Sequence, residues 1–350
     1  MRGPADNYIK QGNTVLMSRA VNKSNRSLAT LEAIYRPIRA EMDLVEKEID
    51  KELSSDQPFI NRMVRHGVRM GGKRLRPALV LFSGHACGKT LPIHIKLATS
   101  VELIHTATLV HDDVLDEADM RRHLETVNAR WDNEASILLG DYILAQSIRL
   151  AAAAETPFAC RAIGTASHQM CEGELRQIAS RGNYALSEEE YFAIVTGKTA
   201  QLCACCCRIG AHYAGADEAT QELLADYGRD LGIAFQIADD LLDLLGDEAV
   251  AGKSLGTDLV KQKTTLPLIR LLQELDETDR KKVIEILGDS ANHCREVLKP
   301  WFDRTDAVEY AQARARDYLQ SAIDRLAGLE PSEAVASLHA LAEFAINRDR

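Results

Sequence analysis

Two short acidic clusters constrain this chain more than any other feature. Both read D-D-x-x-D, one over residues 112–116 and the other over residues 239–243. Each follows a long apolar run, at residues 101–110 and 231–238 respectively. Carboxylates so close to buried helix are costly unless something neutralises them. Divalent cations are the simplest neutraliser, and cations held by carboxylates commonly hold phosphates as well.

The rest of the chain predicts an all-α fold. Of its 350 residues, 46% are hydrophobic and only 5% aromatic, and alternating strand patterns are hard to find. No Gly-, Ser- or Pro-rich linker divides it, so we expect residues 27–350 to form one large helical bundle around a deep central cavity. The polar residues 1–26 are expected to be disordered. Apolar spacing predicts helices over 28–53, 58–70, 76–86, 92–117, 134–154, 157–179, 187–213, 217–245, 262–273, 278–287, 305–326 and 332–346.

Charge and cysteine usage narrow the partners and the compartment. The net charge is −10 without a basic stripe, which argues against nucleic acid. Four of the eight cysteines lie within residues 203–207, unlike a secreted disulfide framework. We interpret them as small, buried, reduced side chains at a tight helix contact, and expect a cytoplasmic protein. No apolar stretch approaches the roughly 18 residues that a membrane-spanning helix needs.

Helical geometry indicates how the acidic clusters could work. Asp112 and Asp116 share a face because they are four residues apart, whereas Asp113 lies about 100° round the helix. Asp239 and Asp243 repeat the arrangement. One such motif alone would suggest a solvated helix end. Two copies, each ending an apolar helix, favour magnesium bound together with substrate phosphate oxygens.

Basic residues near these motifs are candidates for holding phosphates. Residues 71–77 form a glycine turn followed by cations, in which Lys73 can act as a point charge and Arg76 as a two-pronged donor. Arg121 and Arg122 follow the first motif; they could meet the same phosphates or pair with nearby acids. His105 lies two turns before Asp112, where a buried structural histidine is the default interpretation.

Further candidates come from the second half of the chain. Lys198-Thr199 and Gln236 lie on helices expected to face the cavity. A P-loop ending at Lys253 is rejected, because five residues rather than four separate its glycines and no strand precedes it. Lys253 remains a phosphate candidate, and Lys263 is a weaker one.

Together these residues resemble the trans-isoprenyl diphosphate synthases, also called polyprenyl synthetases. The resemblance runs from about residue 28 to the C-terminus, through GGKRLRP at 71–77, LIHTATLVHDDVLDEADMRR at 103–122, GKTAQL at 197–202, FQIADDLLD at 235–243 and GTDLVKQKTTLP at 256–267. It implies a helical homodimer that binds an allylic diphosphate through three magnesium ions between the acidic motifs. Ionisation of that substrate, attack by isopentenyl diphosphate and loss of a proton would give a trans product five carbons longer.

The resemblance also implies a role for each candidate. Asp112, Asp116 and Asp239 would be catalytic metal ligands, with Asp113 and Asp243 supporting them. The allylic substrate would be held by Arg121, Lys198 (also counted as catalytic), Thr199, Gln236 and Lys253. Isopentenyl diphosphate would be held by Lys73, Arg76, His105 and Arg122.

Product length is expected to depend on the residues one turn below the first motif. In the family that this chain resembles, the residue five before the first aspartate often forms the cavity floor, and here it is Ala107. Thr108 comes directly after Ala107, and Ile104 and Val101 lie earlier on the same expected helix. None of the three is aromatic. We therefore expect a long product, a precursor of quinone side chains, unless another residue forms the floor.

Three other interpretations of the sequence remain open. A short-chain synthase making farnesyl or geranylgeranyl diphosphate would have the same motifs. A terpene cyclase would need no second acidic motif of this form and no GGKRLRP string. A non-catalytic prenyl-binding subunit would be expected to lose one motif, although a catalytic subunit that needs a dissimilar partner chain would keep both.

Overall fold

The computed structural model describes residues 30–69, 72–122, 124–246, 255–288 and 294–346. The expectation of disorder at residues 1–26 and the candidate Lys253 lie outside these ranges. Within them, no helix combines the length and apolar character that a membrane crossing requires.

Helices dominate the described residues, as predicted, and the sheet is a single hairpin of two-residue strands. Residues 30–35 are helical and lead into the first of the other elements. These are η1 (Arg36–Ile38), α2 (Arg39–Glu52), α3 (Pro58–Arg69), α4 (Leu75–Ala86), α5 (Pro92–Leu115), β1 (Met120–Arg121), β2 (Leu124–Glu125), α6 (Val127–Arg130), α7 (Asn133–Ala152), α8 (Phe158–Ala179), α9 (Glu188–Val195), η2 (Thr196–Ala200), α10 (Gln201–Tyr213), α11 (Glu218–Leu245), α13 (Thr257–Val260), α14 (Leu266–Glu274), α15 (Glu277–Gly288), α16 (Cys294–Phe302), α17 (Ala307–Leu326) and α18 (Glu333–Ile346).

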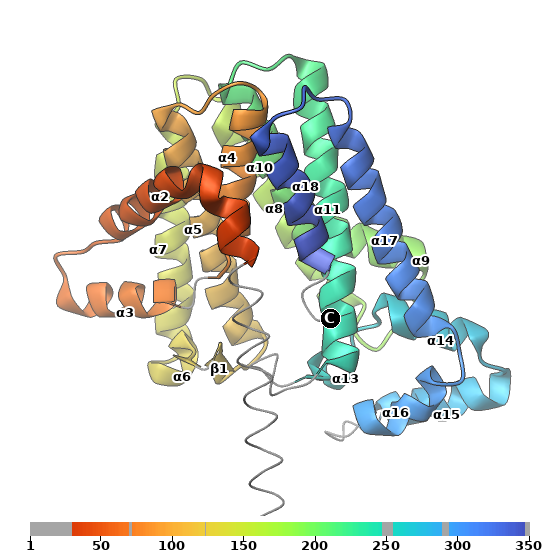
Figure 1. Cartoon of the computed structure of the whole chain (residues 1–350). Helices are drawn as coiled ribbons and strands as arrows, with labels where there is room; N and C mark the ends of the chain where they lie inside the picture. Colours follow the sequence, from red (N-terminus) through yellow and green to blue (C-terminus); the bar gives the residue numbers. More distant parts are fainter. Residues whose placement is uncertain (1–29, 70–71, 123, 247–254, 289–293, 347–350) are drawn as a thin grey trace, which may run out of the picture.

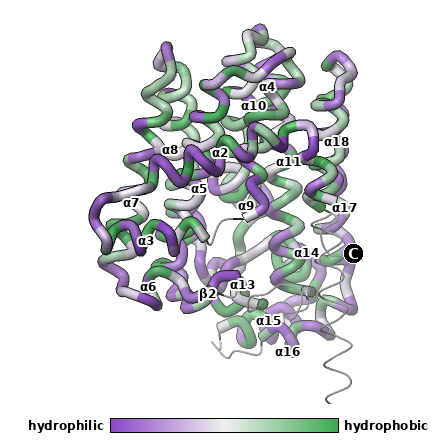
Figure 2. Tube along the Cα trace, turned by 60° about the vertical axis from the view of Figure 1, so that its left-hand side comes forward, coloured by the Kyte–Doolittle hydropathy of each residue, from purple (hydrophilic) through white to green (hydrophobic). Residues whose placement is uncertain are grey.

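The long helices stand side by side and α2 and α3 cross one side of them (Figure 1). α11 packs against α10 and α17, while α5 packs against α7 and α4. The acidic motifs occupy the last turns of α5 and α11, and the elements that follow them, β1 and α13, lie at the same end of the bundle in Figure 1. Hydrophilic residues gather around β2 and α13 in Figure 2.

Side chains at the helix starts explain several boundaries. The Ser187 hydroxyl accepts a hydrogen bond from the Glu190 N–H (3.1 Å), and the Glu190 carboxylate accepts one from the Ser187 N–H (3.0 Å), which begins α9. Asp217 begins α11 by accepting from the Thr220 N–H at 2.8 Å. These caps fix where the helices that carry the site begin.

The core consists of one large and two smaller apolar clusters. The large cluster joins α4, α5, α7, α8, α10, α11 and α18. The four neighbouring cysteines of α10 are free and buried in it, as predicted. α10 and α11 pack tightly here, because a Cβ atom at Gly228 of α11 would come within 2.8 Å of the Cys203 carbonyl carbon.

Several local predictions need correction, among them the missed short helices α6 and α13 and the helix expected from residue 262, which begins at Leu266. The helix expected over 187–213 is interrupted by the π-helical turn η2. The pattern missed α16, which contains Pro300 and lies between two predicted helices. The hairpin β1–β2 was also missed, since two-residue strands are too short to show an alternating pattern.

Candidate active site

The first acidic motif points its carboxylates in two directions. Asp113 is 1% exposed, and its Oδ1 accepts a hydrogen bond from Arg121 Nε at 2.7 Å. Burial raises the Asp113 pKa, against the charge of Arg121. Asp112 is half-buried without a hydrogen-bond or ion-pair partner in the described part of the chain. Burial raises the pKa of Asp112 to about 6, against the charge of Lys198.

Asp116 links the first motif to the segment that follows the second. Its Oδ1 lies 2.6 Å from Lys261 Nζ. Burial acts to raise the Asp116 pKa, but the hydrogen bond from Lys261 and the charge of Lys263 lower it on balance. Lys263 also pairs with Asp258 at 3.1 Å. The end of the first acidic motif therefore meets lysines from the segment that follows the second.

Asp243, the last residue of the second motif, holds the start of α13. Its two oxygens accept hydrogen bonds from the Thr257 hydroxyl and the Asp258 N–H, each 3.0 Å. Asp239 lies one turn earlier on α11 and is half-buried. The structure thus places both predicted ligands at the shared end of the bundle, with the Asp243 carboxylate already engaged by protein donors.

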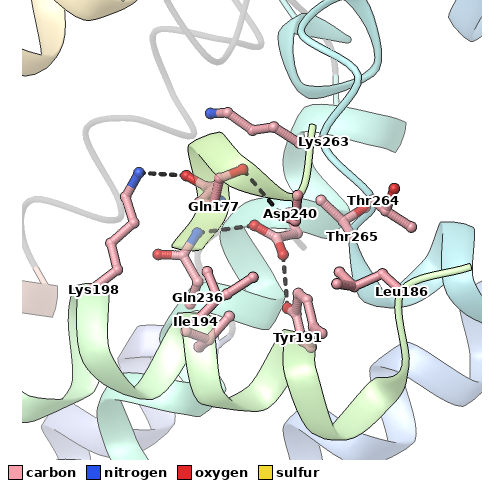
Figure 3. Close-up of a pocket in the computed structure, with 12 residues that line it drawn as sticks. Gln177, Leu186, Tyr191, Ile194, Lys198, Gln236, Asp240, Lys263, Thr264 and Thr265 are labelled. Carbon is pink, nitrogen blue, oxygen red and sulfur yellow. Dashed lines mark hydrogen bonds between the residues drawn. The ribbon is translucent and has the colours of Figure 1, made fainter. Parts of the chain in front are cut away.

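A chain of hydrogen bonds connects the second motif to η2. The Thr199 hydroxyl donates to Gln236 Oε1 (2.8 Å), and Gln236 Nε2 donates to Asp240 Oδ1 (2.9 Å). The Tyr191 hydroxyl donates to Asp240 Oδ2 at 2.7 Å (Figure 3). Burial, followed by the charge of Asp258, raises the Asp240 pKa to about 7. Tyr191, Gln236 and Asp240 line a small pocket together with Gln177, Lys198 and Lys263.

Lys198 is positioned by the π-helical turn and by α8. Its ammonium group contacts the Glu174 carboxylate and donates to Gln177 Oε1 at 2.8 Å. α8 approaches η2 very closely at Gly173, where a Cβ atom would overlap the Lys198 N–H and come within 2.9 Å of the Gly197 carbonyl carbon. π-turns are frequent at functional sites, and this one carries Lys198 and Thr199.

Of the four predicted isopentenyl diphosphate residues, the structure brings Arg76, Arg122 and His105 together. Burial lowers the His105 pKa well below its usual value, and the charges of Arg76 and Arg122 lower it further. The Arg122 guanidinium lies against Gly72. Arg76 Nε is buried without a hydrogen-bond partner in the structure. Lys73 Nζ instead lies 4.9 Å from the centre of the Phe344 ring.

The predicted chain-length residues lie inside α5. Ala107 and Ile104 are buried in the large apolar cluster, and so is Val101. The half-buried Thr108 donates its hydroxyl hydrogen bond to the His105 carbonyl at 2.8 Å. These residues lead from the acidic motif toward the middle of the bundle.

Carboxylates of this kind suit a divalent cation, although the described residues hold no ready-made cluster of three metal-ligating side chains. Asp112 fits best, being a partly desolvated carboxylate without a protein partner among them. Asp116 would have to exchange Lys261 for the metal.

Comparison with known proteins identifies the family. The polyprenyl synthetase family model matches residues 57–304. The chain belongs to the polyprenyl synthetase family. Its relatives include the octaprenyl diphosphate synthase of Haemophilus influenzae, 34% identical over 93% of this chain and 99% of that protein. Heptaprenyl diphosphate synthase component 2 of Bacillus subtilis is 34% identical over 89% of this chain and 88% of that protein.

Solved structures agree with this assignment. A polyprenyl synthase from Caulobacter crescentus, complexed with calcium and isoprenyl diphosphate, superposes with a TM-score of 0.86. It is 32% identical to this chain and covers 91% of it, and 98% of the Caulobacter chain is covered. The fold is therefore the all-α fold of this family, and this polyprenyl synthetase is a prenyltransferase.

Sequence reasoning missed several residues of the site. Tyr191, Glu174 and Gln177 come from helices that showed only amphipathic patterns, so only the packing of α8 and α9 reveals them. Asp240 was passed over although it is the counterpart of Asp113. Lys261 could have been found by its place beside Lys263.

Proposed function

We propose that this enzyme joins isopentenyl diphosphate head to tail to an allylic prenyl diphosphate and makes a long-chain all-trans polyprenyl diphosphate. The observation that carries the proposal is the Asp116–Lys261 contact, since it brings the end of the first acidic motif to the segment that follows the second. The related synthases named above make products of this class.

In this proposal the two acidic motifs bind the allylic diphosphate through magnesium. Asp112, Asp116 and Asp239 would hold the metal, with Asp113 and Asp243 as supports. Three ions are proposed; when bound, they neutralise the charge that develops on the leaving diphosphate. The charge of Lys198 acts on Asp112, and Lys198 would bind the same diphosphate as a fixed cation.

The basic group would bind isopentenyl diphosphate. His105 is neutral at physiological pH, so it can donate one hydrogen bond to a phosphate oxygen without adding charge. Among the described residues the buried Arg76 Nε has no hydrogen-bond partner, and the Arg122 guanidinium lies against Gly72. The double bond of the bound substrate would attack the allylic cation, and the departing diphosphate would take the proton.

A long product is proposed because α5 presents no bulky residue below the first motif. Ala107 has the smallest apolar side chain, and the side chains of Ile104 and Val101 are of moderate size. The buried apolar surroundings would also exclude water from the cation.

Two further features belong to the proposal. We propose a homodimer, since α7 exposes the apolar side chains of Ile137, Leu138 and Ile148. We also propose a cytoplasmic location, because all eight cysteines are free and burial raises the pKa of the Cys205 thiol to about 12, typical of unreactive, reduced side chains.

The test is conversion by the purified chain alone. Farnesyl diphosphate, labelled isopentenyl diphosphate and Mg²⁺ should give labelled products of about 30 carbons or more on reverse-phase thin-layer chromatography. Asp112→Ala should lower turnover about 100-fold or more, because a carboxylate that holds metal in the transition state is lost. Asp50→Ala is the matched control, as Asp50 is an exposed aspartate on α2.

Products of 15 or 20 carbons would instead indicate a short-chain synthase. An inactive single chain that becomes active with a second, dissimilar chain would indicate a two-component enzyme; the name of the Bacillus relative suggests such an arrangement for that protein. Normal turnover by Asp112→Ala, with an unchanged circular dichroism spectrum, would contradict the metal assignment.

A further inference from the structure

Tyr191 is a buried tyrosine whose hydroxyl reaches the second acidic motif from outside it. The residue lies on α9 and is 4% exposed. Its ring packs in an apolar cluster and edge-on to Phe192, with ring centres 5.3 Å apart. A phenylalanine would make the same contacts, so the hydroxyl is not needed for packing. The hydrogen bond that it donates goes to Asp240 Oδ2 at 2.7 Å.

Asp240 connects the Tyr191 hydroxyl to two parts of the site. Along α11 it follows Asp239 directly, so fixing the Asp240 carboxylate fixes the rotation of the helical turn that presents Asp239. Its other oxygen accepts from Gln236 Nε2 at 2.9 Å. That bond settles the orientation of the Gln236 amide and leaves Gln236 Oε1 to accept from the Thr199 hydroxyl at 2.8 Å.

The result is a single chain of donors and acceptors across three elements. It runs from α9 through the end of α11 to η2, whose Lys198 precedes Thr199 directly. Each of the two Asp240 oxygens has a donor, which matters because a buried carboxylate without donors is strongly destabilised. In Figure 3 the Asp240 carboxylate receives the Tyr191 hydroxyl from below and the Gln236 amide from the left.

We propose that Tyr191 is a positioning residue, which sets through Asp240 and Gln236 the orientation of the second acidic motif relative to Lys198 and Thr199. It would thereby tune binding of the metal–diphosphate part of the allylic substrate. This inference rests on the proposed function, but it concerns a residue that neither acidic motif contains.

The test compares two tyrosine variants. Tyr191→Phe keeps the ring and removes the hydroxyl. We expect Mg²⁺-dependent binding of inorganic pyrophosphate, measured by isothermal titration calorimetry, to weaken about tenfold, because a buried carboxylate loses one of its donors. The KM for farnesyl diphosphate should rise about as much, while the KM for isopentenyl diphosphate changes less than about twofold.

Tyr227→Phe is the matched control. Tyr227 is also fully buried, lies on α11, and donates its hydroxyl hydrogen bond to the Leu338 carbonyl at 2.7 Å. This variant should lower the melting temperature and leave pyrophosphate binding as in the wild type. A purely structural contribution of Tyr191 would make the two variants behave alike.

Asp240→Asn provides a second measurement, which decides the question if Tyr191→Phe does not fold. Asp240→Asn should weaken pyrophosphate binding to a similar extent. The double variant, with both Tyr191→Phe and Asp240→Asn, should bind as tightly as whichever single variant has the lower affinity, because both changes break one chain of contacts. Wild-type pyrophosphate affinity in Tyr191→Phe, or in Asp240→Asn, would overturn the inference. Absence of product from the wild-type chain would overturn the proposed function alone, since pyrophosphate binding is measured separately.

Discussion

The second aspartate of each acidic motif has the same task. Asp113 pairs with Arg121, and Asp240 accepts from Tyr191 and Gln236, so both carboxylates are buried and held by protein groups. Helical spacing predicted that Asp113 would point away from Asp112. The spacing could not say what would receive these side chains, because Tyr191 is 49 residues away from Asp240 in the sequence.

Ala107 offers a test of product length at the residue scale. Ala107→Phe should shorten the extracted products, because a ring at this buried position would block space below the first motif. Overpacking should also cost about 1–3 kcal/mol of stability. Reverse-phase thin-layer chromatography of the products, together with thermal melting, would measure both effects.

Ala342→Phe controls for overpacking alone. Ala342 is a fully buried alanine of α18 in the same apolar cluster. The products of Ala342→Phe should have the wild-type length even if the melting temperature of the variant falls. Unchanged products from Ala107→Phe would reject Ala107 as the floor of the cavity.

At the scale of elements, the π-turn η2 is the part of the site that the sequence conceals. Its residues read as ordinary helix, and the interruption follows from contacts with α8 and α11. Gly173 of α8 and Gly232 of α11 lie on either side, and a Cβ at Gly232 would come within 2.6 Å of Ala200 Cα. By contrast the ends of α5 and α11 were predicted to within a few residues, since the acidic motifs themselves end the apolar runs.

We expect Gly173→Ala to damage the site through this contact. The new methyl group would meet the backbone of Lys198 and Gly197, which cannot rotate away as a side chain can. Turnover should fall about tenfold or more, equivalent to about 1.4 kcal/mol in the activation barrier. Steady-state kinetics and thermal melting would check this.

Gly164→Ala is the matched control on the same helix. Nothing lies within 4 Å of the Cβ that it would add. Because alanine favours helix over glycine, the control should be neutral or more stable by about 0.5–1 kcal/mol, with wild-type turnover. Equal activity in both variants would show that α8 does not set the position of η2.

At the scale of the whole molecule, the net charge is −10, yet cationic side chains gather around the candidate site. Arg76 and Arg122 act on His105, while Lys198, Lys261 and Lys263 act on Asp116 of the first acidic motif. Cations in both places would suit the proposed reaction, which needs two diphosphates held at once.

The exposed face of α7 supplies a prediction for the assembly. Leu138 and Ile148 are 60% and 56% exposed, and replacing both by glutamate should prevent a second copy from packing there. Light scattering should then report a mass near the 38.7 kDa of one chain in place of twice that value. Val297→Glu, at an exposed apolar position of α16, should leave the mass unchanged. A wild-type mass of one chain would contradict the dimer.

The short helix α16 has a bearing on how this enzyme could evolve. Arg295 lies near the start of α16. Its Nε donates a hydrogen bond to the Leu244 carbonyl at 2.6 Å, and a terminal guanidinium nitrogen donates one to the Gly246 carbonyl. It thus caps the helix on which the second acidic motif lies. A lineage that trimmed this outlying part of the chain would have to supply a substitute cation there, or lose the terminal turn to which metal binding is assigned in the proposed function.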